Sequence, residues 1–477
     1  MEIPHLTAVS IVTGIANGTL SSLEVAECLL RRADACSGLN TLINFDPSRF
    51  LEAAEAADQK LAAGSAVGPL HGLPLVIKDN IDVAGYPTTA ATPALKNHEP
   101  GQTAPVMRKL LDAGAIVMSK ANMHEMAFSP GVSQPEDGRE AVWGAFGTAR
   151  NPYDPDRSPA GSSSGTGAAV AARIAPAGLG TDTGGSVRNP AAWCGIAGLR
   201  PTTGRYSQRG IVPISWTRDT AGPMARHVAD LELLDRVICS TDAVPPADLS
   251  RLRFGVERRF FCSDCDPDIL ALFEAEVERL ASAGAEIVDV AIPGLDLLMG
   301  TSAQHLAAYE FSRAVPKYLA DTGAGVSFED VISQIAASGL GEHFTALGST
   351  DAISDTAYQE ALNDMRPALQ AAYSESFETA GLDALIFPST IIAATRLDDW
   401  GTHTMGGREV PKFLASSRNV QPASIGGFAG LTVPMGLTPK GLPAAIGFDG
   451  PRGNDRNLLA IGLAYETLRP EIPAPPL

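Results

Sequence analysis

Apolar and polar residues alternate with a helical period in several parts of the chain. Over 23–33, apolar residues recur every three to four positions, and Ser21 followed by Glu24 fits a capping box at the start of a helix. Pattern and composition together predict further helices elsewhere. They are expected over 48–63, 105–113, 166–175, 222–239, 268–283 and 455–468, with a mainly helical segment over 293–380.

Short apolar runs between these helices predict buried strands. The run that starts at Leu73 ends in the polar residues Lys78, Asp79 and Asn80, which is typical of a strand that emerges at a site. Further strands are expected at 115–118, 254–256, 286–290 and 383–388. Because helices and strands alternate, we expect an α/β fold with a mixed β-sheet core covered by α-helices. No internal repeat or linker divides the chain, so 1–477 is expected to form a single domain.

The segment 147–220 differs from the rest because it is rich in Gly, Ser, Thr and Pro. Within it, only 166–175 has the pattern of a helix. The same segment carries Trp, Arg, Asp and Cys residues, which a simple linker would lack. A loop-rich stretch of this length inside a compact protein is more often functional than idle, so we expect it to contribute to a site.

Composition and charge narrow the class of protein. Hydrophobic residues make up 45% of the 477 positions and charged residues 19%, which excludes a disordered chain. The net charge of −18 repels phosphate groups and argues against nucleic-acid binding. No run of 18 apolar residues and no secretory signal are found, so neither a membrane segment nor export is expected. Six scattered cysteines fit a reducing compartment, and we expect a cytoplasmic protein.

Motifs for cofactors and metals are not found in the sequence. No phosphate-binding loop, dinucleotide fingerprint or HExxH motif is present, and the eight histidines do not lie at metal-binding spacing. Cys262 and Cys265 form a CxxC, but no second ligand pair has the spacing of a zinc site. The sequence therefore predicts neither a metal nor a cofactor.

Two glycine- and serine-rich motifs could carry nucleophilic chemistry. The first, GSSSG at 161–165, matches the GxSxG motif that would make Ser163 a nucleophile. That motif needs a preceding strand, whereas 150–159 is turn-like. In the second, GTDTGGSVR at 180–188, two glycines allow backbone N–H groups to converge beside Ser186, and Asp182 and Arg188 could pair to hold the loop. The alternative for this loop is a glycine turn whose serine caps a helix.

Together with Lys78, these motifs resemble the amidase signature family. The likeness is strong over 65–240 and returns over 419–448, whereas 290–415 matches little. The supporting segments are 87–94, 122–127, 194–202 and 219–226. Departures are Ser164 and Ala91, where the family commonly has glycine, and a polar stretch near 133–142 at the expected pocket rim.

The resemblance implies a Ser-cisSer-Lys triad. Ser186 would be the nucleophile, Ser162 the bridging serine after a cis peptide bond, and Lys78 the base. The N–H groups of Thr183, Gly184 and Gly185, with that of Ser186, would form an oxyanion hole. Phe128 and Ser129 would line the acyl site, and 290–415 would complete the substrate pocket.

A lysine base must be mostly neutral, although the ordinary pKa of lysine is about 10.4. A fall of roughly three to four pH units is required, and the acidic net charge acts in the opposite direction. Burial at the end of an apolar strand would lower the pKa enough. The alternative is a surface lysine that pairs with Asp79.

Other conspicuous residues are expected to be structural. We expect His124 and Glu125 to brace a helix end. Trp143, Trp193 and Trp216 are expected to pack in the core rather than to form a substrate cage. Cys194 is expected to be a small buried residue.

The resemblance implies hydrolysis of a small-molecule carboxamide. The segments 210–215 and 441–451 are similar to the indoleacetamide and mandelamide hydrolase branch, which suggests an aryl-substituted acetamide as substrate. One alternative is the glutamine-hydrolysing A subunit of the tRNA-dependent amidotransferase. Another is a non-catalytic binding protein on an amidase fold. The family also implies a homodimer.

Overall fold

The computed structural model describes residues 2–128, 142–299, 302–337, 340–348, 353–399 and 401–477. The helices are Ala8–Ala16 (α1), Ser22–Ala35 (α2), Pro47–Ala62 (α3), Pro105–Asp112 (α4), Ser164–Ala171 (α5), Arg188–Cys194 (α6), Val228–Cys239 (α7), Arg258–Phe261 (α8), Pro267–Ser282 (α9), Leu295–Met299 (α10), Ser302–Thr322 (α11), Phe328–Ser333 (α12), Gly341–Gly348 (α13), Asp355–Glu360 (α14), Arg366–Ala380 (α15), Lys412–Ser417 (α16), Gln421–Gly426 (α17) and Asp455–Leu468 (α18). The strands are Leu42–Ile43 (β1), Pro74–Lys78 (β2), Ile116–Ala121 (β3), Ala177–Asp182 (β4), Ala197–Arg200 (β5), Thr220–Ala225 (β6), Arg253–Val256 (β7), Glu286–Asp289 (β8), Ala384–Pro388 (β9), Thr402–Met405 (β10), Arg408–Pro411 (β11), Ala429–Leu437 (β12) and Pro443–Gly450 (β13).

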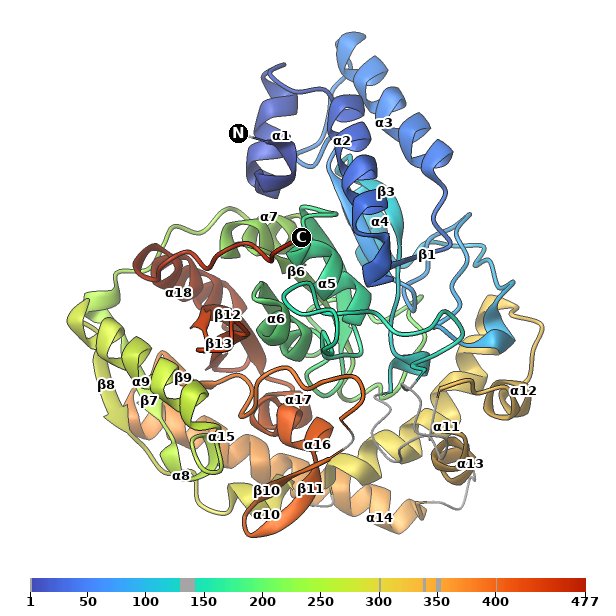
Figure 1. The fold of residues 1–477 in the computed structure, drawn as a ribbon. Coiled ribbons are helices and arrows are strands. Elements are labelled where there is room, and N and C mark those ends of the chain that lie inside the picture. The colour runs from blue at the N-terminus through green and yellow to red at the C-terminus, as the bar shows by residue number, and fades with distance from the viewer. Residues whose placement is uncertain (1, 129–141, 300–301, 338–339, 349–352, 400) are drawn as a thin grey trace.

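One large mixed sheet forms the centre of the molecule (Figure 1). Within the described residues it has eleven strands in the order β1-β3-β2-β4-β6-β5-β12-β13-β9-β7-β8. β2 runs parallel to β3 and β4, whereas β4, β6, β5, β12, β13 and β9 are joined antiparallel. The expected α/β fold with a mixed sheet is therefore confirmed.

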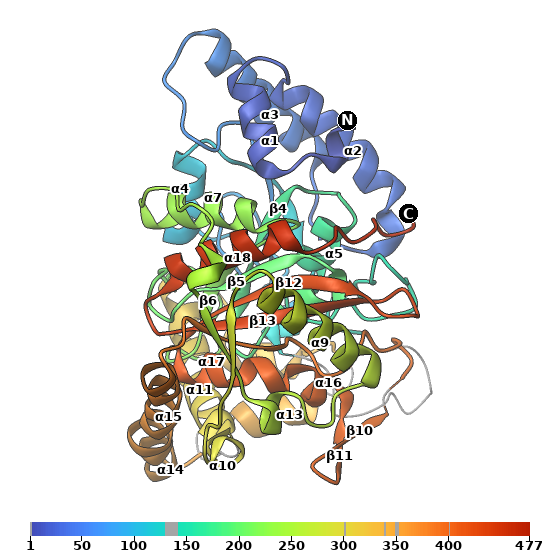
Figure 2. The same ribbon diagram turned by 90° about the vertical axis from the view of Figure 1, so that its left-hand side faces the viewer.

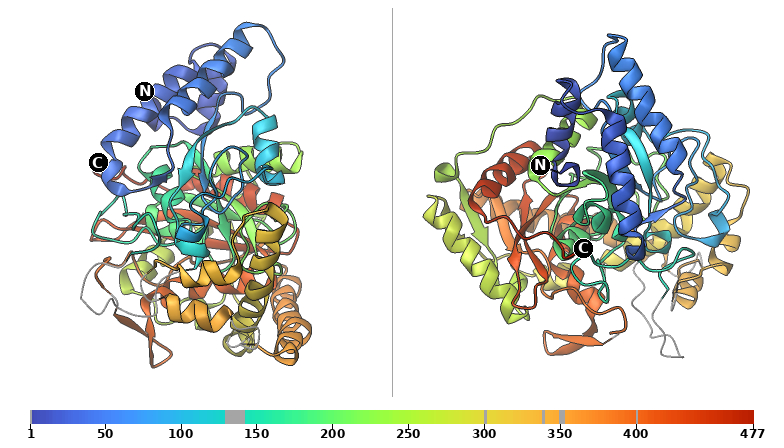
Figure 3. Two further views of the ribbon diagram at one scale, coloured as in Figure 1. Left: turned by 90° about the vertical axis from the view of Figure 1, so that its right-hand side faces the viewer. Right: turned by 45° about the horizontal axis from the view of Figure 1, so that its top comes forward.

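Helices cover both faces of this sheet. A Cβ at Gly430 of β12 would lie 3.0 Å from Arg188 of α6, whereas the next residue, Leu431, lies against Gly462 of α18. Successive side chains of a strand point to opposite faces, so α6 and α18 lie on opposite faces. Figures 1 and 2 place the sheet between α1–α3 at one end and the helices of 295–380 at the other. Both chain ends lie on the side of α1–α3 (Figure 3).

Most of the predicted elements are found. α3, α4, α9 and α18 match their predictions closely, 293–380 is mainly helical as expected, and Ser21 caps α2 by accepting a hydrogen bond from Glu24 N. The helix predicted over 222–239 is wrong in its first part, because Thr220–Ala225 forms strand β6 before α7 begins. Every residue of β6 is buried, so it lacks the alternation that marks a half-exposed strand.

The segment 147–220 is more regular than predicted. It contains β4, α6 and β5 besides α5, which begins and ends earlier than the expected helix over 166–175. Its richness in glycine predicts loops, but two of these glycines lie within β4. A Cβ at Gly178 would lie 2.6 Å from Val76 O, and one at Gly180 would lie 2.7 Å from Ser163 Oγ. These glycines therefore allow α5 and β2 to pack closely on β4.

No helix among the described residues is long and apolar enough to cross a membrane. The carboxyl ends of β2 and β4 bring polar side chains together. Because these neighbouring strands are parallel, their carboxyl ends lie at the same edge, with Ile77 opposite Leu179. Lys78 and Thr181 follow these two residues and so lie together.

Candidate active site

Lys78 is the last residue of β2 and its side chain is fully buried. Its Nζ lies 2.8 Å from Ser162 Oγ and 2.7 Å from Thr181 Oγ1. Asn80 Nδ2 donates to the same Thr181 hydroxyl over 3.1 Å, which fixes the rotamer of that side chain. The amine is thus enclosed by hydroxyl groups rather than by carboxylates.

Burial lowers the pKa of Lys78 to about 7, although the carboxylates of Asp182 and Asp219 act in the opposite direction. About half of these amines are therefore neutral at pH 7. The alternative of a surface lysine paired with Asp79 is wrong. Asp79 is also fully buried, and its carboxylate lies 3.4 Å from Lys120 Nζ.

The Gly161–Ser162 peptide bond is cis, as the family resemblance implies. Ser162 O accepts a hydrogen bond from His124 N over 3.1 Å, and a Cβ at Gly161 would lie 2.0 Å from the His124 ring. The next residue, Ser163, turns away from the cavity, because its Oγ donates to Thr181 O over 3.2 Å. No strand leads directly into this loop from 150–159, which agrees with the argument against a nucleophile elbow at Ser163.

The Ser186 loop joins the Ser162 loop through the main chain. Ser163 N donates to Ser186 O over 3.2 Å, so the two serine motifs lie next to each other although these residues are 23 positions apart in the sequence. Ser186 and Gly161 line the same cavity. The structure therefore brings the Ser186, Ser162 and Lys78 segments together at one edge of the sheet.

Asp182 holds the loop that carries Ser186. Its carboxylate accepts hydrogen bonds from Gly185 N over 2.8 Å and from Val187 N over 3.3 Å. Arg188 forms two hydrogen bonds of 3.1 Å with the same carboxylate, and Arg200 adds a third of 3.1 Å. Burial alone would raise the pKa of Asp182, but the two guanidinium groups hold it well below its usual range. The predicted pairing of Asp182 with Arg188 is confirmed.

The backbone N–H groups of residues 183–186 differ in whether they already donate a hydrogen bond within the protein. Among the described residues, those of Thr183, Gly184 and Ser186 have no hydrogen-bond partner within the protein. The Gly185 N–H differs from the expectation, because it donates to Asp182 and is not free for an oxyanion. Three of the four expected N–H groups are therefore unoccupied.

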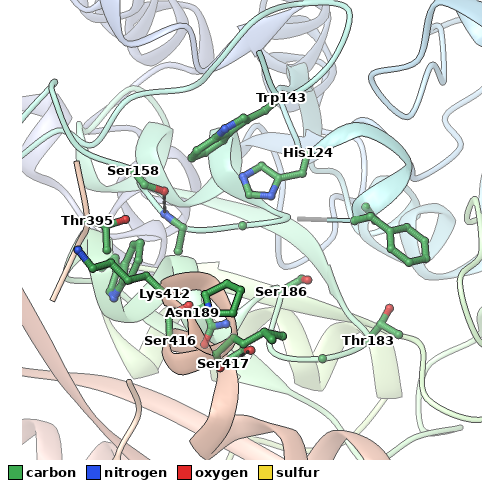
Figure 4. A pocket seen from close by; sticks show the side chains of 18 of the residues that line it. His124, Trp143, Ser158, Thr183, Ser186, Asn189, Thr395, Lys412, Ser416 and Ser417 are labelled. Carbon is green, nitrogen blue, oxygen red and sulfur yellow. Dashed lines mark hydrogen bonds between the residues drawn. The ribbon is translucent and has the colours of Figure 1, made fainter. Parts of the chain in front are cut away.

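A cavity of about 260 Å³ opens above this loop (Figure 4). Ser186 and Thr183 lie on one side of it, His124 and Trp143 on another, and Lys412 and Thr395 on a third. Its apolar lining residues are Ala127, Phe128, Trp143, Ala160, Trp193, Ile214, Ala307, Leu397, Pro411 and Leu414. The cavity thus has a polar base, and its walls combine aromatic and aliphatic side chains with polar ones such as Lys412 and Thr395.

Aromatic rings form much of these walls. Phe128 lines the cavity as predicted, and its ring packs against Phe311 and Phe344 with centroid distances of 5.0 and 4.9 Å. Trp143 and Trp193 are buried in apolar clusters, as predicted, and part of each also lines the cavity. Trp216 is 43% exposed, so the prediction of core packing is wrong for that residue. Ser129, the other predicted lining residue, lies outside the described residues, as does most of 133–142.

The contacts of His124 and Glu125 are those of residues with a structural role. Burial and the nearby Lys78 lower the pKa of His124 to about 3, so its ring is neutral, and the ring packs on Trp143 with centroids 4.2 Å apart. Glu125 Oε2 accepts hydrogen bonds from the N–H groups of Ala336 and Ala337, just after α12, as expected of a bracing residue.

Cys194, Cys262 and Cys265 are all free thiols in the structure. Cys194 is fully buried, as predicted, and burial raises the pKa of its thiol. In the part of the chain that the structure describes, no group of three or more His, Cys, Asp or Glu side chains could hold a metal ion.

Sequence reasoning missed several residues around the Ser186 loop. Arg218, Gln421 and Asn189 line the cavity at its polar base, and Lys412 and Leu414 line it from the segment 395–417. Arg218 and Gln421 belong to segments that resemble the family, but their contact with each other spans 203 residues of sequence. No local pattern could have indicated it.

Comparisons with known proteins agree with this geometry. The family model described as amidase matches residues 24–459. An indoleacetamide hydrolase of Agrobacterium vitis is 41% identical over 447 residues, which cover 94% of this chain and 93% of that protein. A mandelamide hydrolase of Pseudomonas putida is 37% identical over 469 residues, covering 96% and 90%. The structure of native peptide amidase from Stenotrophomonas maltophilia matches with a TM-score of 0.84 and 30% identity, covering 99% of this chain and 98% of that one. The chain therefore belongs to the amidase signature family of amide hydrolases.

Proposed function

We propose that this protein hydrolyses an aryl-substituted acetamide to the arylacetate and ammonia, with Ser186, Ser162 and Lys78 as its catalytic triad. The observation that carries this proposal is the buried Lys78 amine, 2.8 Å from Ser162 Oγ and next to the loop of Ser186. A serine hydroxyl is a weak nucleophile until a base removes its proton. A lysine with a pKa of about 7 is a suitable base at neutral pH.

The acylation step follows from this arrangement. Ser186 Oγ bonds to the amide carbon while its proton passes to Ser162, whose own proton passes to Lys78. The carbonyl π electrons move to oxygen, where the free N–H groups of Thr183, Gly184 and Ser186 donate to it. The C–N bond then breaks, and the proton held by Lys78 returns through Ser162 to the departing ammonia. Water cleaves the resulting acyl-enzyme by the same route.

The walls of the cavity support an aryl-substituted substrate. Phe128, Trp143 and Trp193 offer ring faces and edges, and aromatic pairs contribute about 0.5–1.5 kcal/mol beyond the area they bury. An acetamide group on an aromatic ring would place its carbonyl at Ser186 with the ring against these walls. The printed names of the relatives, indoleacetamide and mandelamide hydrolase, both describe amides of this class.

The two alternative functions would require different groups in the cavity. The glutamine-hydrolysing subunit would need charged partners for the glutamine ammonium and carboxylate groups. Arg396, Asp399 and Lys412 line the cavity besides its apolar residues, so glutamine is included in the assay below as a direct test of this alternative. A non-catalytic protein would have no need of a buried amine, which is costly to keep out of water. The homodimer and the cytoplasmic location remain predictions.

Ammonia release by the purified chain tests the proposal. The panel would hold indole-3-acetamide, mandelamide, phenylacetamide, propionamide and glutamine. We expect kcat/KM for at least one arylacetamide to exceed that for propionamide by about 100-fold or more, since burying an aromatic ring contributes roughly 2–3 kcal/mol or more. Preference for glutamine, or release only with added partner subunits, would favour the amidotransferase subunit. Light scattering on the same sample measures the number of subunits.

A further inference from the structure

Two side chains bind the carbonyl groups of the loop whose N–H groups face the substrate. Arg218 Nε donates to Thr183 O over 3.1 Å, and Gln421 Nε2 donates to Gly184 O over 3.1 Å. Arg218 Nη2 also donates to Gln421 Oε1 over 2.8 Å. We call this pair the Arg218–Gln421 clamp. It links the turn before β6 to the first residue of α17.

The clamp fixes the direction of the N–H groups in the loop. In a trans peptide the C=O and N–H bonds point in opposite directions, so a bound carbonyl determines where the next N–H points. Holding Thr183 O therefore orients the N–H of Gly184, which is free of protein partners. Holding Gly184 O orients the N–H of Gly185, which donates to Asp182. Two consecutive peptide groups are thus fixed through their carbonyls.

The clamp is itself rigid. Arg218 is 4% exposed, its N donates to Ser215 O over 3.0 Å, and its carbonyl accepts from Arg200 Nη2 over 2.7 Å. A Cβ at Gly184 would lie 2.9 Å from Gln421 Nε2 and 3.3 Å from Arg218 Nη2. The loop therefore needs glycine at 184 because both clamp side chains lie directly against it. Burial lowers the pKa of Arg218 to about 10, which leaves the guanidinium charged at neutral pH.

We propose that Arg218 and Gln421 are positioning residues that hold the oxyanion hole in its reactive geometry. The inference rests on the proposed role of Ser186 as nucleophile and not on the choice of arylacetamide. Preorganised donors accelerate a reaction only if they point to where negative charge develops, and the clamp keeps the Gly184 donor in that direction. The Arg218 charge stabilises the same oxyanion through the Thr183–Gly184 peptide group.

The test uses Arg218→Lys, Gln421→Met and the double variant, assayed with whichever amide of the panel is hydrolysed. Arg218→Lys keeps the positive charge but loses the planar fork that reaches Thr183 O and Gln421 together. Since losing one oxyanion donor costs about 10²–10³ in kcat, we expect misorientation to lower kcat roughly 10- to 100-fold, with KM changed less than about threefold. The double variant should lose little more than either single variant, because the clamp acts as a unit.

Inhibitor binding separates positioning from substrate contact, since both residues line the cavity. The aldehyde that corresponds to the substrate forms a hemiacetal: its carbon bonds to Ser186 Oγ, the π electrons move to the oxygen in the hole, and the serine proton passes to Lys78. The corresponding carboxylate binds without this bond. We expect the clamp variants to weaken aldehyde binding in parallel with kcat and to leave carboxylate binding within about threefold.

The matched control is Arg226→Lys, since Arg226 also donates to backbone carbonyls, those of Val170 and Ala175, but does not line this cavity. It should retain the kcat of the parent chain. Unchanged kcat in the clamp variants, or an equal loss of aldehyde and carboxylate affinity, would overturn the inference. A parent chain that hydrolyses no amide of the panel would instead contradict the proposed function.

Discussion

The base and the walls of the active-site cavity are built on different principles. The base comprises β2 with Lys78, the Gly161–Ser163 turn and the 181–188 loop, and it consists of small polar residues and main-chain groups. The walls comprise Phe128, with the helices α11 and α13 behind it, and the segment 395–417. Phe128 presents an aromatic surface, whereas 395–417 contributes both apolar residues, such as Leu397 and Leu414, and charged ones, such as Lys412.

These two regions also differ in how their atoms are held. In the base, hydrogen bonds of about 3 Å fix Thr183 O, Gly184 O and Gly185 N individually. In the walls, Phe128 is held by the rings of Phe311 and Phe344, which other apolar residues could replace with modest repacking. From this difference we expect the base of the cavity to determine the reaction and the walls to determine the substrate. Substitutions in each region test that expectation.

The largest effect is expected for Ser186→Ala, which removes the proposed nucleophile from the base of the cavity. We expect kcat to fall at least about 10⁴-fold for every amide that the protein hydrolyses. Because the side chain lies at the cavity surface, the unfolding temperature should stay within a few degrees. Ammonia release and thermal unfolding on the same sample provide the measurement. A loss confined to aryl substrates would contradict the assigned role.

Lys78→Met replaces the proposed general base, the lysine amine, with an uncharged side chain of similar length. We expect kcat to fall about 10²–10⁴-fold, the usual contribution of a general base, and equally for large and small amides. Lys120→Met is a poor control because Lys120 is a buried ion-pair partner of Asp79. Lys60→Met, on an exposed part of α3, is better and should retain full activity. Substantial turnover in Lys78→Met would remove the proposed base.

The dependence of kcat/KM on pH also tests the proposed role of Lys78 as a general base. Lys78 acts as a base only when neutral, and burial holds its pKa at about 7. Below that pKa, kcat/KM should fall about tenfold for each pH unit, so activity at pH 5 should be roughly one hundredth of the plateau reached above pH 8. Aryl and aliphatic amides should give the same apparent pKa. A profile that is flat from pH 5 to 8 would contradict a lysine base.

Phe128→Ala is expected to have a smaller and selective effect because Phe128 belongs to the walls. Removing one aromatic contact should lower kcat/KM for an arylacetamide about 10- to 100-fold. The value for propionamide should change less than about threefold. Phe377→Ala, in the separate core cluster around Tyr373 and Phe428, controls for lost stability. An equal loss on both substrates would mean that the walls also support the chemistry.

Local pattern predicted the elements with a strong period, such as α18, whose bounds agree with the expected 455–468. It did not predict the hairpin of β12 and β13 or the strand β6, because nearly every residue of these strands is buried and no alternation of apolar and polar residues marks them. Fully buried strands lack a polar face.

For the candidate site too, the sequence predicted only part of the arrangement. Motifs that resemble the family indicated Lys78, Ser162 and Ser186, and the structure brings the segments of these residues together; their catalytic roles stay a prediction. They could not indicate that Gly185 N–H is taken by Asp182, or that Gln421 reaches Gly184 O. Both facts depend on how the loop is turned, which only long-range packing determines.

The burial of Lys78 has a consequence for its unwanted reactivity. A neutral amine is a nucleophile toward carbon dioxide, isocyanate and reactive acyl metabolites as well as a base. The side chain of Lys78 is fully buried, however, and its nitrogen is covered by the hydroxyls of Ser162 and Thr181. In the proposed mechanism, protons would reach the amine through these hydroxyl groups, whereas the same cover would keep electrophiles away from it.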